Sequence, residues 1–507
     1  MNWKKYKQLP IEQKQNESYY IIGLDIGNDS SALAFYNLAE NEPEAIDLSG
    51  GYGKPSIPTV LQYVPETKEW VFGEYAVLNR GVGTIFSSLF SKMGRFDELD
   101  VGGRSVSAAS VFALFVKELL ANVKSLNPKA EIVGIVVSVP AYFSEQAQEE
   151  LMRTFKLAGY EKELIALVPD RQCVLAHHYR KPPERPECAL ILDLGSREMR
   201  GGLYDISADG DKINALSGSS VFDEEISMSA LNRDITDLFA SFLQDGYDKE
   251  QLLAFTYQHK DILFQKNIRM KPQKLYYNFV YPPVRHTLTN ERVAEMLAPY
   301  TKRFEQFIRD VLEKNLFGRK ITPAQVEKVL CVGGGFDMLW AKEAVSKAFA
   351  KKAVFYKNPK LITAEGAALI AAQRLGIAGA PLSIEDNHQL ANPIGIADGG
   401  SFLTLVERNG FWWQKHAPKL VLVNSEVNGE LTLTLAELLQ NGETRAISQV
   451  KVEGLPKRPK GVTRLEIGVE FRSNTEMCLN VRDVGFGELF PSTTPIQTQV
   501  SRQCLIP

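Results

Sequence analysis

Hydrophobic patterning divides the chain into zones of different texture. From about residue 19 to residue 378, short apolar runs alternate with longer stretches of helical spacing, which predicts an α/β region. Residues 392–492 are nearly all short alternating strands between turn signals, a pattern typical of a β-sandwich. Residues 379–391 contain glycine, proline and asparagine with little periodicity and predict a linker, while the polar segments 1–18 and 493–507 predict an N-terminal extension and a tail. The strands predicted in the sandwich are 402–407, 419–423, 430–435, 446–452, 463–471 and 477–482.

The α/β zone contains the same unit twice. In each copy a short apolar strand enters an Asp-x-Gly turn and a second strand, and another apolar strand follows much later in the chain. The turns are Asp25-Ile26-Gly27 and Asp193-Leu194-Gly195, and the later strands are 132–139 and 328–332. The second late strand enters Gly333-Gly334-Gly335 and then a helical pattern. The repetition predicts two α/β halves with a turn of the same kind in each.

Such turns have a chemical use. Glycine leaves out the side chain, so backbone N–H groups can approach a phosphate, and the aspartate can hold a hydrated Mg²⁺ against it. Two facing turns could hold a triphosphate from both sides of a cleft. The glycine run from Gly333 suits the approach of a nucleotide, with a helix N-terminus nearby. The alternatives are that Asp25 and Asp193 only close tight turns, and that the glycine run is only a close contact between helix and strand.

Composition narrows the class of protein. The chain has 507 residues, 44% apolar and 23% charged, with a net charge of −3, so it is an ordinary globular chain with more than one domain. The small net charge argues against a nucleic-acid binder driven by bulk charge. No apolar run approaches the roughly 20 residues that span a bilayer, and the start of the chain is polar and lysine-rich, unlike a secretory signal. The five cysteines are scattered without metal-site spacing, which favours a reducing, cytoplasmic location.

Several stretches resemble the 70-kDa heat-shock chaperones. They are IIGLDIGNDSSALA at 21–34, VSVPAYFSEQAQE at 137–149, AEGAA at 364–368 and VEGLPKRPKGVTRLEIGVEF at 452–471. The resemblance covers about residues 19 to 490. It implies an α/β actin-like, two-lobed nucleotide-binding domain (19–378) followed by an all-β sandwich (392–492) that binds extended protein segments.

The resemblance also implies a function and a site. ATP or ADP with Mg²⁺ would bind in the cleft, and the nucleotide state would set the peptide affinity of the sandwich through the linker. Unfolded or extended protein segments and co-chaperones would be the partners, without nucleic acid or membrane. Asp25 and Asp193 would hold Mg²⁺, and Asp170 would assist catalysis. The expected nucleotide-binding residues are Gly27, Asn28, Gly195, Ser196, Gly333, Gly334 and Gly335.

The chain departs from the family at catalytic positions of the first half. Two threonines of the first turn are replaced by Asn28 and Asp29. The position of the catalytic lysine holds Phe90, and Lys92 could replace it only after a shift in register. The glutamate near the metal has only Asp170 beside its position, one residue out of register.

The second half departs as well. Ser196 and Arg197 replace two glycines, Arg200 stands at the second aspartate, and Asp337 replaces the arginine that covers the adenine. Phosphoryl transfer depends on positioning and electrostatics, so these changes predict an ATPase that is slow at most. Arg197 and Arg200 either bring positive charge to the phosphates or are surface arginines on a hairpin.

The C-terminal part departs from the family in two ways and also holds an aromatic group. Residues 381–386 retain only a trace of the family's linker signature, and the family's helical lid does not follow the sandwich. Phe411-Trp412-Trp413 is either an anchor for a partner or part of the core.

Three hypotheses remain open. The first is a divergent heat-shock-70-like chaperone with a weak or degenerate ATPase. The second is a pseudo-enzyme scaffold of the same fold, which acts by protein–protein contact without nucleotide. The third is a small-molecule kinase or phosphatase of the actin-like superfamily, in which the sandwich has no place. Fold alone does not choose among them.

Overall fold

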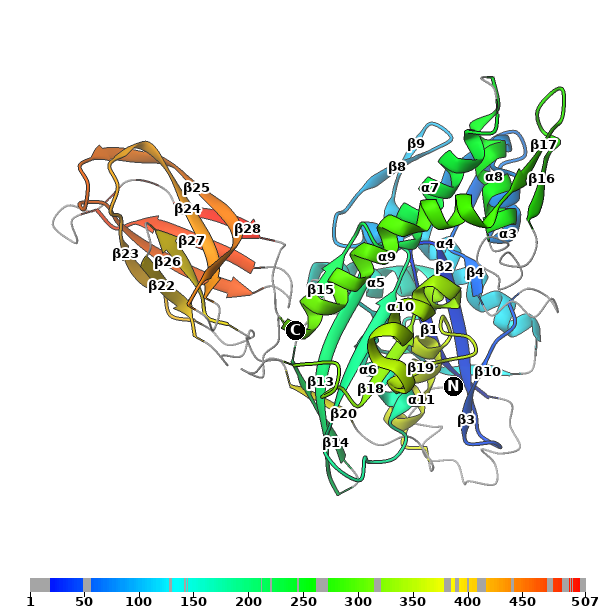
Figure 1. Ribbon diagram of the computed structural model, residues 1–507, viewed down its shortest axis with the longest axis horizontal. Helices are drawn as coiled ribbons and strands as arrows, with labels where there is room; N and C mark the ends of the chain where they lie inside the picture. The colour runs from blue at the N-terminus through cyan, green and yellow to red at the C-terminus, as the bar shows by residue number, and fades with distance from the viewer. Residues whose placement is uncertain are drawn as a thin grey trace.

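The structure is a computed structural model. It describes residues 19–48, 56–126, 130–140, 143, 145–210, 212–218, 221–243, 246–260, 272–313, 321–377, 384–387, 392–398, 401–407, 416–438, 442–471, 477–485, 492, 494 and 496–501. The predicted N-terminal extension (1–18) and Phe411-Trp412-Trp413 lie outside the described residues. Figure 1 shows the chain as two parts, a mixed α/β region and an all-β region.

The first half of the α/β region is built on a six-stranded sheet. Strand β1 runs antiparallel to β2 and parallel to β10, which is parallel to β11. Strand β10 is buried along almost its whole length, as expected for a parallel strand covered on both faces. In sheet order the strands are β11 (Leu164–Pro169), β10 (Glu131–Val139), β1 (Tyr19–Ile26), β2 (Ser30–Asn37) and β3 (Glu42–Ala45), and β4 (Ser56–Pro58) also pairs with β2.

The second half repeats this order in a seven-stranded sheet. Strand β12 runs antiparallel to β13 and parallel to β18, which is parallel to β19. The predicted repetition of the strand–turn–strand unit is confirmed, since each turn connects the two central antiparallel strands of its sheet. The strands are β19 (Ala353–Phe355), β18 (Lys328–Val332), β12 (Glu187–Leu194), β13 (Met199–Asp209), β14 (Lys212–Ser217) and β20 (Ile384–Asn387), and β15 (Val221–Asp223) pairs with β13.

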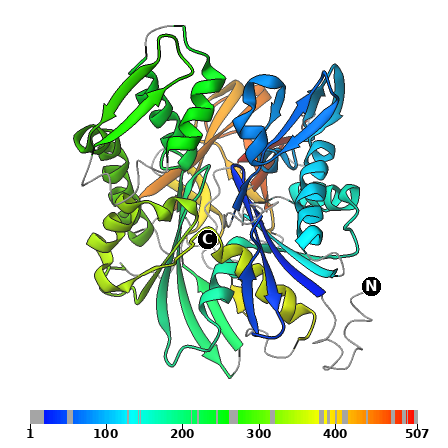
Figure 2. The same ribbon diagram turned by 90° about the vertical axis from the view of Figure 1, so that its right-hand side faces the viewer.

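Two helices each follow the sheet of one half in the sequence and pack against the sheet of the other half. Helix α6 (Asp170–His178) follows the first sheet, yet its Val174 packs in the same cluster as residues of β12 and β13 in the second. Helix α11 (Ile362–Arg374) follows the second sheet and packs on β1, β2 and β10 of the first. The helices touch where a Cβ on Gly366 would lie 1.8 Å from the carbonyl oxygen of Cys173, so this contact requires glycine. Figure 2 shows the two halves on either side, with the yellow-green α11 low between them.

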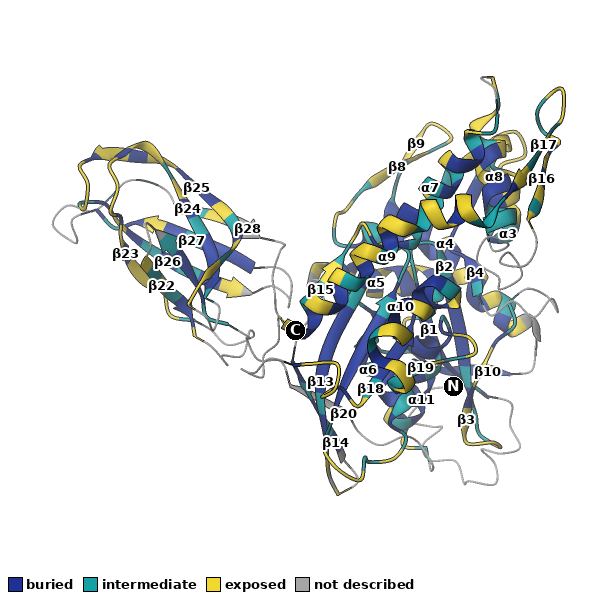
Figure 3. Cartoon of the chain, in the orientation of Figure 1, coloured by how far each residue is buried: buried dark blue, intermediate teal, exposed yellow. Residues whose placement is uncertain are grey.

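Other helices cover the outer faces of the sheets. Helices α4 (Ala108–Leu126) and α5 (Glu145–Ala158) share a core with the first sheet. Helix α9 buries one stripe and exposes the other, which Figure 3 shows as alternating blue and yellow. The helices that share a core with the second sheet are α7 (Met228–Ala240), α8 (Lys249–His259), α9 (Asn290–Glu313) and α10 (Leu339–Phe349).

Smaller elements stand at the edges of both halves. The small elements are α3 (Glu74–Leu78), β5 (Leu61–Val64), β6 (Glu69–Phe72), β7 (Thr84–Phe86), β8 (Glu98–Val101), β9 (Arg104–Ser107), β16 (Gln273–Tyr277) and β17 (Val284–Leu288).

No helix among the described residues is long and apolar enough to cross a membrane.

The C-terminal region consists of two four-stranded sheets that enclose one hydrophobic core, a β-sandwich. All the strands predicted there are present, and two more were missed, β21 and β28. One sheet has the order β22 (Ser401–Val406), β21 (Ile394–Asp398), β24 (Val427–Leu438) and β25 (Thr444–Arg458), and the other has the order β23 (Lys419–Leu422), β26 (Arg464–Phe471), β27 (Met477–Asp483) and β28 (Gln497–Ser501).

Two strands lie in segments predicted as linker and tail. Strand β20, within residues 379–391, pairs in parallel with β14, so part of the predicted linker forms the edge of the second α/β sheet. Strand β28, within residues 493–507, pairs with β27. Both are edge strands, and β28 reads Gln-Thr-Gln-Val-Ser. Backbone hydrogen bonds hold such an edge strand in the sheet, so its side chains need not alternate between apolar and polar. The hydropathy pattern of the sequence therefore does not reveal it.

Candidate functional site

The two Asp-x-Gly turns have the same backbone geometry. The Gly27 N–H donates to the Ser30 carbonyl at 3.1 Å, and the Gly195 N–H donates to the Glu198 carbonyl at 3.0 Å. In each turn two residues stand between the bonded pair, and the aspartate precedes the pair at the end of a central strand.

The turns open into one cavity of about 1160 Å³. The start of α7 is tied to the second turn, because the N–H groups of Met228 and Ser229 donate to the carbonyls of Gly195 and Ser196 at 3.0 and 2.8 Å. The predicted site residues that line the cavity are Asp25, Gly27, Asn28, Asp170, Asp193, Gly195, Ser196, Gly333 and Gly334.

The glycine run serves two purposes. Gly333 has φ +87°, and a Cβ there would lie 2.3 Å from Asp193 Oδ1, so this residue must be glycine for the aspartate to sit where it does. Gly334 borders the cavity, and a Cβ added to it would meet no atom within 4 Å. Gly335 is buried beneath Leu194, where a Cβ would lie 2.2 Å from Leu194 Cγ. Gly335 is therefore a packing residue and is not among the residues that line the cavity.

Asp25 at the first turn is paired with a lysine. Its Oδ2 lies 2.5 Å from Lys360 Nζ, and its Oδ1 accepts a hydrogen bond from Ser138 Oγ at 2.8 Å. The side chains of Asp25 and Lys360 are 18% and 16% exposed, so the pair is largely withdrawn from solvent. The ammonium also stands beside the turn itself, since a Cβ on Gly27 would lie 3.4 Å from Lys360 Nζ.

The loop that carries Lys360 is attached to the glycine run. The Pro359 carbonyl accepts a hydrogen bond from the Gly333 N–H at 3.2 Å. This contact positions the residue just before Lys360, at the entrance to α11.

Asp193 at the second turn is paired with an arginine. Arg200 Nη2 lies 2.5 Å from Asp193 Oδ2, while Nη1 of the same guanidinium is hydrogen-bonded to Asp170. Nε of Arg200 lies 3.7 Å from Glu198 Oε1. Burial raises the pKa of Asp193, and the charge of Arg200 opposes that rise. Because Asp170 belongs to the first half and Arg200 to the second, this network joins the halves across the cavity.

The two hairpin arginines both line the cavity but differ in their exposure and partners. Arg197 is 41% exposed and pairs with Glu224 at 3.4 Å, which fits a surface arginine. Arg200 lies inside the cavity and binds two of the predicted catalytic aspartates. Lys360 was not predicted at all; the available signal was a lysine two residues before the helix that carries the AEGAA stretch.

Three further residues of the first half, Phe90, Lys92 and Asp29, stand at positions where the chain departs from the heat-shock family or beside them. Phe90 lines the cavity and stacks on Phe143 with ring centroids 4.9 Å apart, so this position carries no charge. Lys92 pairs with Asp97 at 3.2 Å and is not among the lining residues. Burial raises the pKa of Asp29, opposed first by the charge of Lys260.

Further contacts join the two halves at the border of the cavity. Ser229 Oγ donates to Asp29 Oδ2 at 3.3 Å, and Tyr257 donates to Glu74 at 2.6 Å. Arg80 pairs with Glu250 at 2.9 Å. The halves are thus held together around the cavity by contacts of the chain itself.

The cavity has the properties of a phosphate site. Its lining combines glycine turns with cationic side chains, which attract phosphate oxygens. Those side chains are Arg80, Arg197, Arg200, Lys260, Lys342 and Lys360. The lining also holds acidic side chains, of which Asp25, Asp170 and Asp193 are paired with Lys360 or Arg200. The volume of the cavity is compatible with a nucleoside di- or triphosphate.

A divalent metal ion fits less well. Among the described residues no group of three or more His, Cys, Asp or Glu side chains is placed to hold a metal ion. Asp25 and Asp193, the aspartates predicted to bind Mg²⁺, already have Lys360 and Arg200 at their Oδ2 atoms. Their magnesium role stays a prediction.

Comparisons with known proteins cover most of the chain. A family model described as a domain of unknown function (DUF8552) matches residues 397–501, up to the last residue of β28. A second, the C-terminal part of a family of unknown function (DUF5716), matches residues 42–194. The chain is also similar to the protein named Chaperone protein DnaK of Thermosipho melanesiensis, with 22% identity over 490 residues, 92% of this chain and 79% of that protein. This match supports a distant relationship with the 70-kDa heat-shock chaperones and, at the level of the family, a chaperone-like function.

Proposed function

We propose that this protein is a heat-shock-70-like chaperone of the cytoplasm. Its α/β region, of actin-like two-lobed architecture, binds an adenine nucleotide, and its β-sandwich binds extended protein segments. The observation that carries the proposal is the pair of matching Asp-x-Gly turns that open into one cavity beside Gly333 and Gly334. The distant similarity to a chaperone over nearly the whole chain supports the same reading.

Hydrolysis of the nucleotide is slow or absent in this proposal. A general base must accept a proton from the attacking water. Three carboxylates of the cavity, Asp25, Asp170 and Asp193, are each paired with Lys360 or Arg200, so an attacking water would have to compete with a cation of the chain for their oxygens. Phe90 adds no charge where transition-state charge would need stabilising. The function is therefore one of binding and response to the nucleotide rather than turnover.

The sandwich offers apolar side chains on its edge strands. Leu420 and Leu422 of β23 are 59% and 51% exposed, and Leu403 of β22 is 36% exposed. Strands β23 and β22 each stand at the edge of their sheet. An edge strand can pair with an extended segment through its backbone, and neighbouring apolar side chains add preference.

Calorimetry with ATP and Mg²⁺ tests the nucleotide part of the proposal. We expect micromolar binding and a raised melting temperature for the wild type. Gly334→Leu should abolish both, because it places a side chain in the cavity without strain at the glycine. Gly81→Leu is the matched control, since it also meets no atom within 4 Å but lies outside the cavity lining. Neither heat nor thermal shift in the wild type would contradict the proposal.

One set of observations favours a second candidate, the pseudo-enzyme scaffold without nucleotide. Ion pairs and hydrogen bonds of the chain join the halves around the cavity with no ligand required, including Asp170–Arg200 and Arg80–Glu250. Under this candidate the same calorimetry gives no signal, and the protein acts through its surfaces.

A further inference from the structure

We propose that Lys360 and Arg200 replace the divalent cation at this site, so that the cavity binds a nucleoside di- or triphosphate without Mg²⁺. The inference rests on the proposed nucleotide-binding function and specifies its chemistry. It is carried by the same arrangement at both turns, an aspartate of the Asp-x-Gly motif paired at 2.5 Å with a cation of the chain.

Each aspartate is engaged from two sides. Asp25 has Lys360 at one carboxylate oxygen and the Ser138 hydroxyl at the other. Asp193 has Arg200 at one oxygen, while the other lies against Gly333, where a Cβ would come within 2.3 Å. A metal ion bound directly or through its water would have to displace an ammonium or a guanidinium from a carboxylate in a largely buried site. The displaced cation would then stand beside the metal and repel it.

The two cations are suited to take over the metal's part. Together they carry two positive charges, as Mg²⁺ does. An ammonium has three N–H donors and a guanidinium five, and both bind phosphate oxygens by charge-assisted hydrogen bonds. Lys360 Nζ has Asp25 as its carboxylate partner in the structure, which leaves N–H donors that can face a phosphate.

The two cations also lie beside the two turns between which the phosphates of a nucleotide would bind. Lys360 Nζ would lie 3.4 Å from a Cβ on Gly27, so the ammonium adjoins the first turn. Arg200 is on β13, directly opposite Asp193 in the strand pairing. A phosphate chain between the turns would therefore have one cation on each side. Mg²⁺ also gives up its bound water reluctantly and requires near-octahedral coordination. A lysine or arginine side chain binds a phosphate without either requirement.

The two aspartates acquire a different role from that of metal ligands. They hold the cations in place, and Asp170 joins Asp193 in holding Arg200. They are positioning residues here. The nucleotide then binds as the metal-free anion, with Lys360 and Arg200 as the cations beside its phosphates.

Calorimetry with ATP in EDTA and in excess Mg²⁺ tests the inference. For the wild type we expect dissociation constants that agree within about threefold in the two conditions. Binding that is detected only with Mg²⁺ would overturn the inference while leaving the nucleotide-binding function intact. Absence of binding in both conditions would instead contradict the proposed function.

Lys360→Met provides the sharper test. It should weaken binding in EDTA by about 10- to 100-fold, because a charge-assisted hydrogen bond is lost. It should also make binding respond to Mg²⁺, because the carboxylate of Asp25 becomes accessible to the ion. Merely structural damage would weaken binding equally in both conditions, and that result would count against the inference.

Two more variants complete the design. Lys347→Met removes a lysine from an ion pair outside the cavity, with Glu305 at 2.7 Å, and should leave both affinities unchanged. Arg200→Gln repeats the test at the second turn and covers the case in which Lys360→Met does not fold. Pyrophosphate in place of ATP separates recognition of phosphate alone from recognition of the whole nucleotide.

Discussion

His178, in the last turn of α6, is a histidine whose protonation the fold opposes. Burial and then the nearby charge of Lys328 lower its pKa to about 4, while Glu187 pulls the other way. The charge of His177 also lowers the pKa, and the Tyr356 hydroxyl lies 3.1 Å from His178 Nδ1. Its neutral form is therefore part of the native packing.

The direction in which stability changes with pH follows from the pKa of His178 in the folded and in the unfolded chain. An unfolded histidine has a pKa of about 6.5, so the unfolded chain takes up the proton first as the pH falls. The stability that His178 contributes is fully present above about pH 6.5 and is lost as the pH falls toward about 4. Thermal melts across this range should show a smaller acid-side loss for His178→Gln than for the wild type. Equal slopes for His178→Gln and the wild type would contradict the prediction.

Single residues also set the limit of what the sequence could predict about the site. The Asp-x-Gly turns and the glycine run are local, so spacing alone was enough to predict residues that line one cavity. The partner of Asp25 could not, because Lys360 lies 335 residues further along the chain. In the sequence Gly335 looks like its neighbours, yet it packs against Leu194, which only the fold brings close to it.

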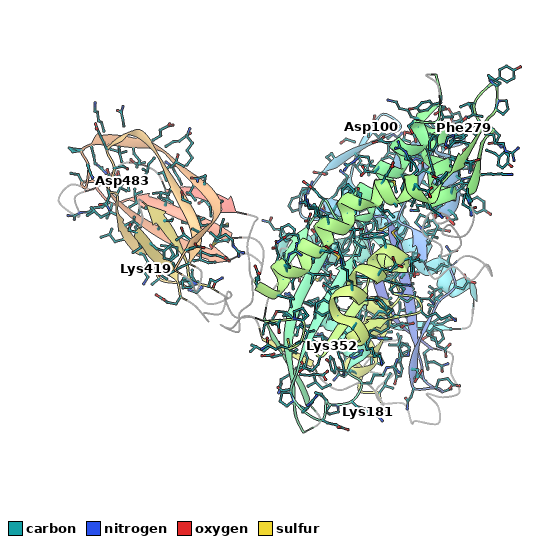
Figure 4. The ribbon with its side chains drawn as sticks, viewed as in Figure 1. Asp100, Lys181, Phe279, Lys352, Lys419 and Asp483 are labelled. Atoms are coloured by element: carbon teal, nitrogen blue, oxygen red, sulfur yellow. The ribbon has the colours of Figure 1, made fainter. Side chains whose placement is uncertain are left out.

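At the scale of elements, Arg458 and Asp483 connect strands of opposite sheets in the sandwich. They form a two-pronged ion pair with distances of 2.7 and 2.9 Å, and the Asp483 side chain is 0% exposed (labelled in Figure 4). Ser492 Oγ and the Gly485 N–H donate to the same carboxylate. Burial raises the pKa of Asp483, but these donors outweigh it and the pKa is lowered.

Asp483→Asn should therefore destabilise the sandwich strongly. The change leaves the Arg458 guanidinium buried without its counter-charge, a loss of about 3–5 kcal/mol for a broken buried pair. Denaturant unfolding of the full chain, followed by a signal from the sandwich, measures it. Glu430→Gln is the control, because its partner Lys451 is at the surface and the pair contributes little. A variant as stable as the control would show that the pair does not hold the two sheets together.

Elements differed in how readily the sequence revealed them. The sandwich strands β22 to β27 alternate apolar and polar residues, because one face lies on the core and the other in solvent, and the period is visible without an alignment. Strand β20 is only four residues long and lies in a segment without such a period. Its existence depends on an open edge at β14, a feature of the assembled sheet rather than of the local sequence.

At the scale of the whole molecule, the cavity and the sandwich are connected through the second sheet. Strand β13 carries Arg200 and pairs with β14, and β14 pairs with β20, the segment before the sandwich. A nucleotide that rearranges Arg200 would act on a sheet whose edge is the connecting segment itself. Two sites joined in this way can be coupled, provided that the bound and empty cavity favour different positions of β20.

The coupling gives a prediction for the full chain. Saturating ATP should change the affinity of the sandwich for an extended apolar peptide by about 5- to 150-fold, the usual range of coupling between sites. Fluorescence anisotropy of a labelled peptide measures this, and an unchanged affinity in the wild type would refute the coupling. Glu385→Pro should remove the change while leaving ATP binding intact, because proline lacks the N–H of a strand residue and is disfavoured within a sheet. Glu385→Ala is the control, because it keeps the backbone N–H, and it should behave as the wild type. If the proline variant still shows the change in peptide affinity, the coupling does not pass through β20.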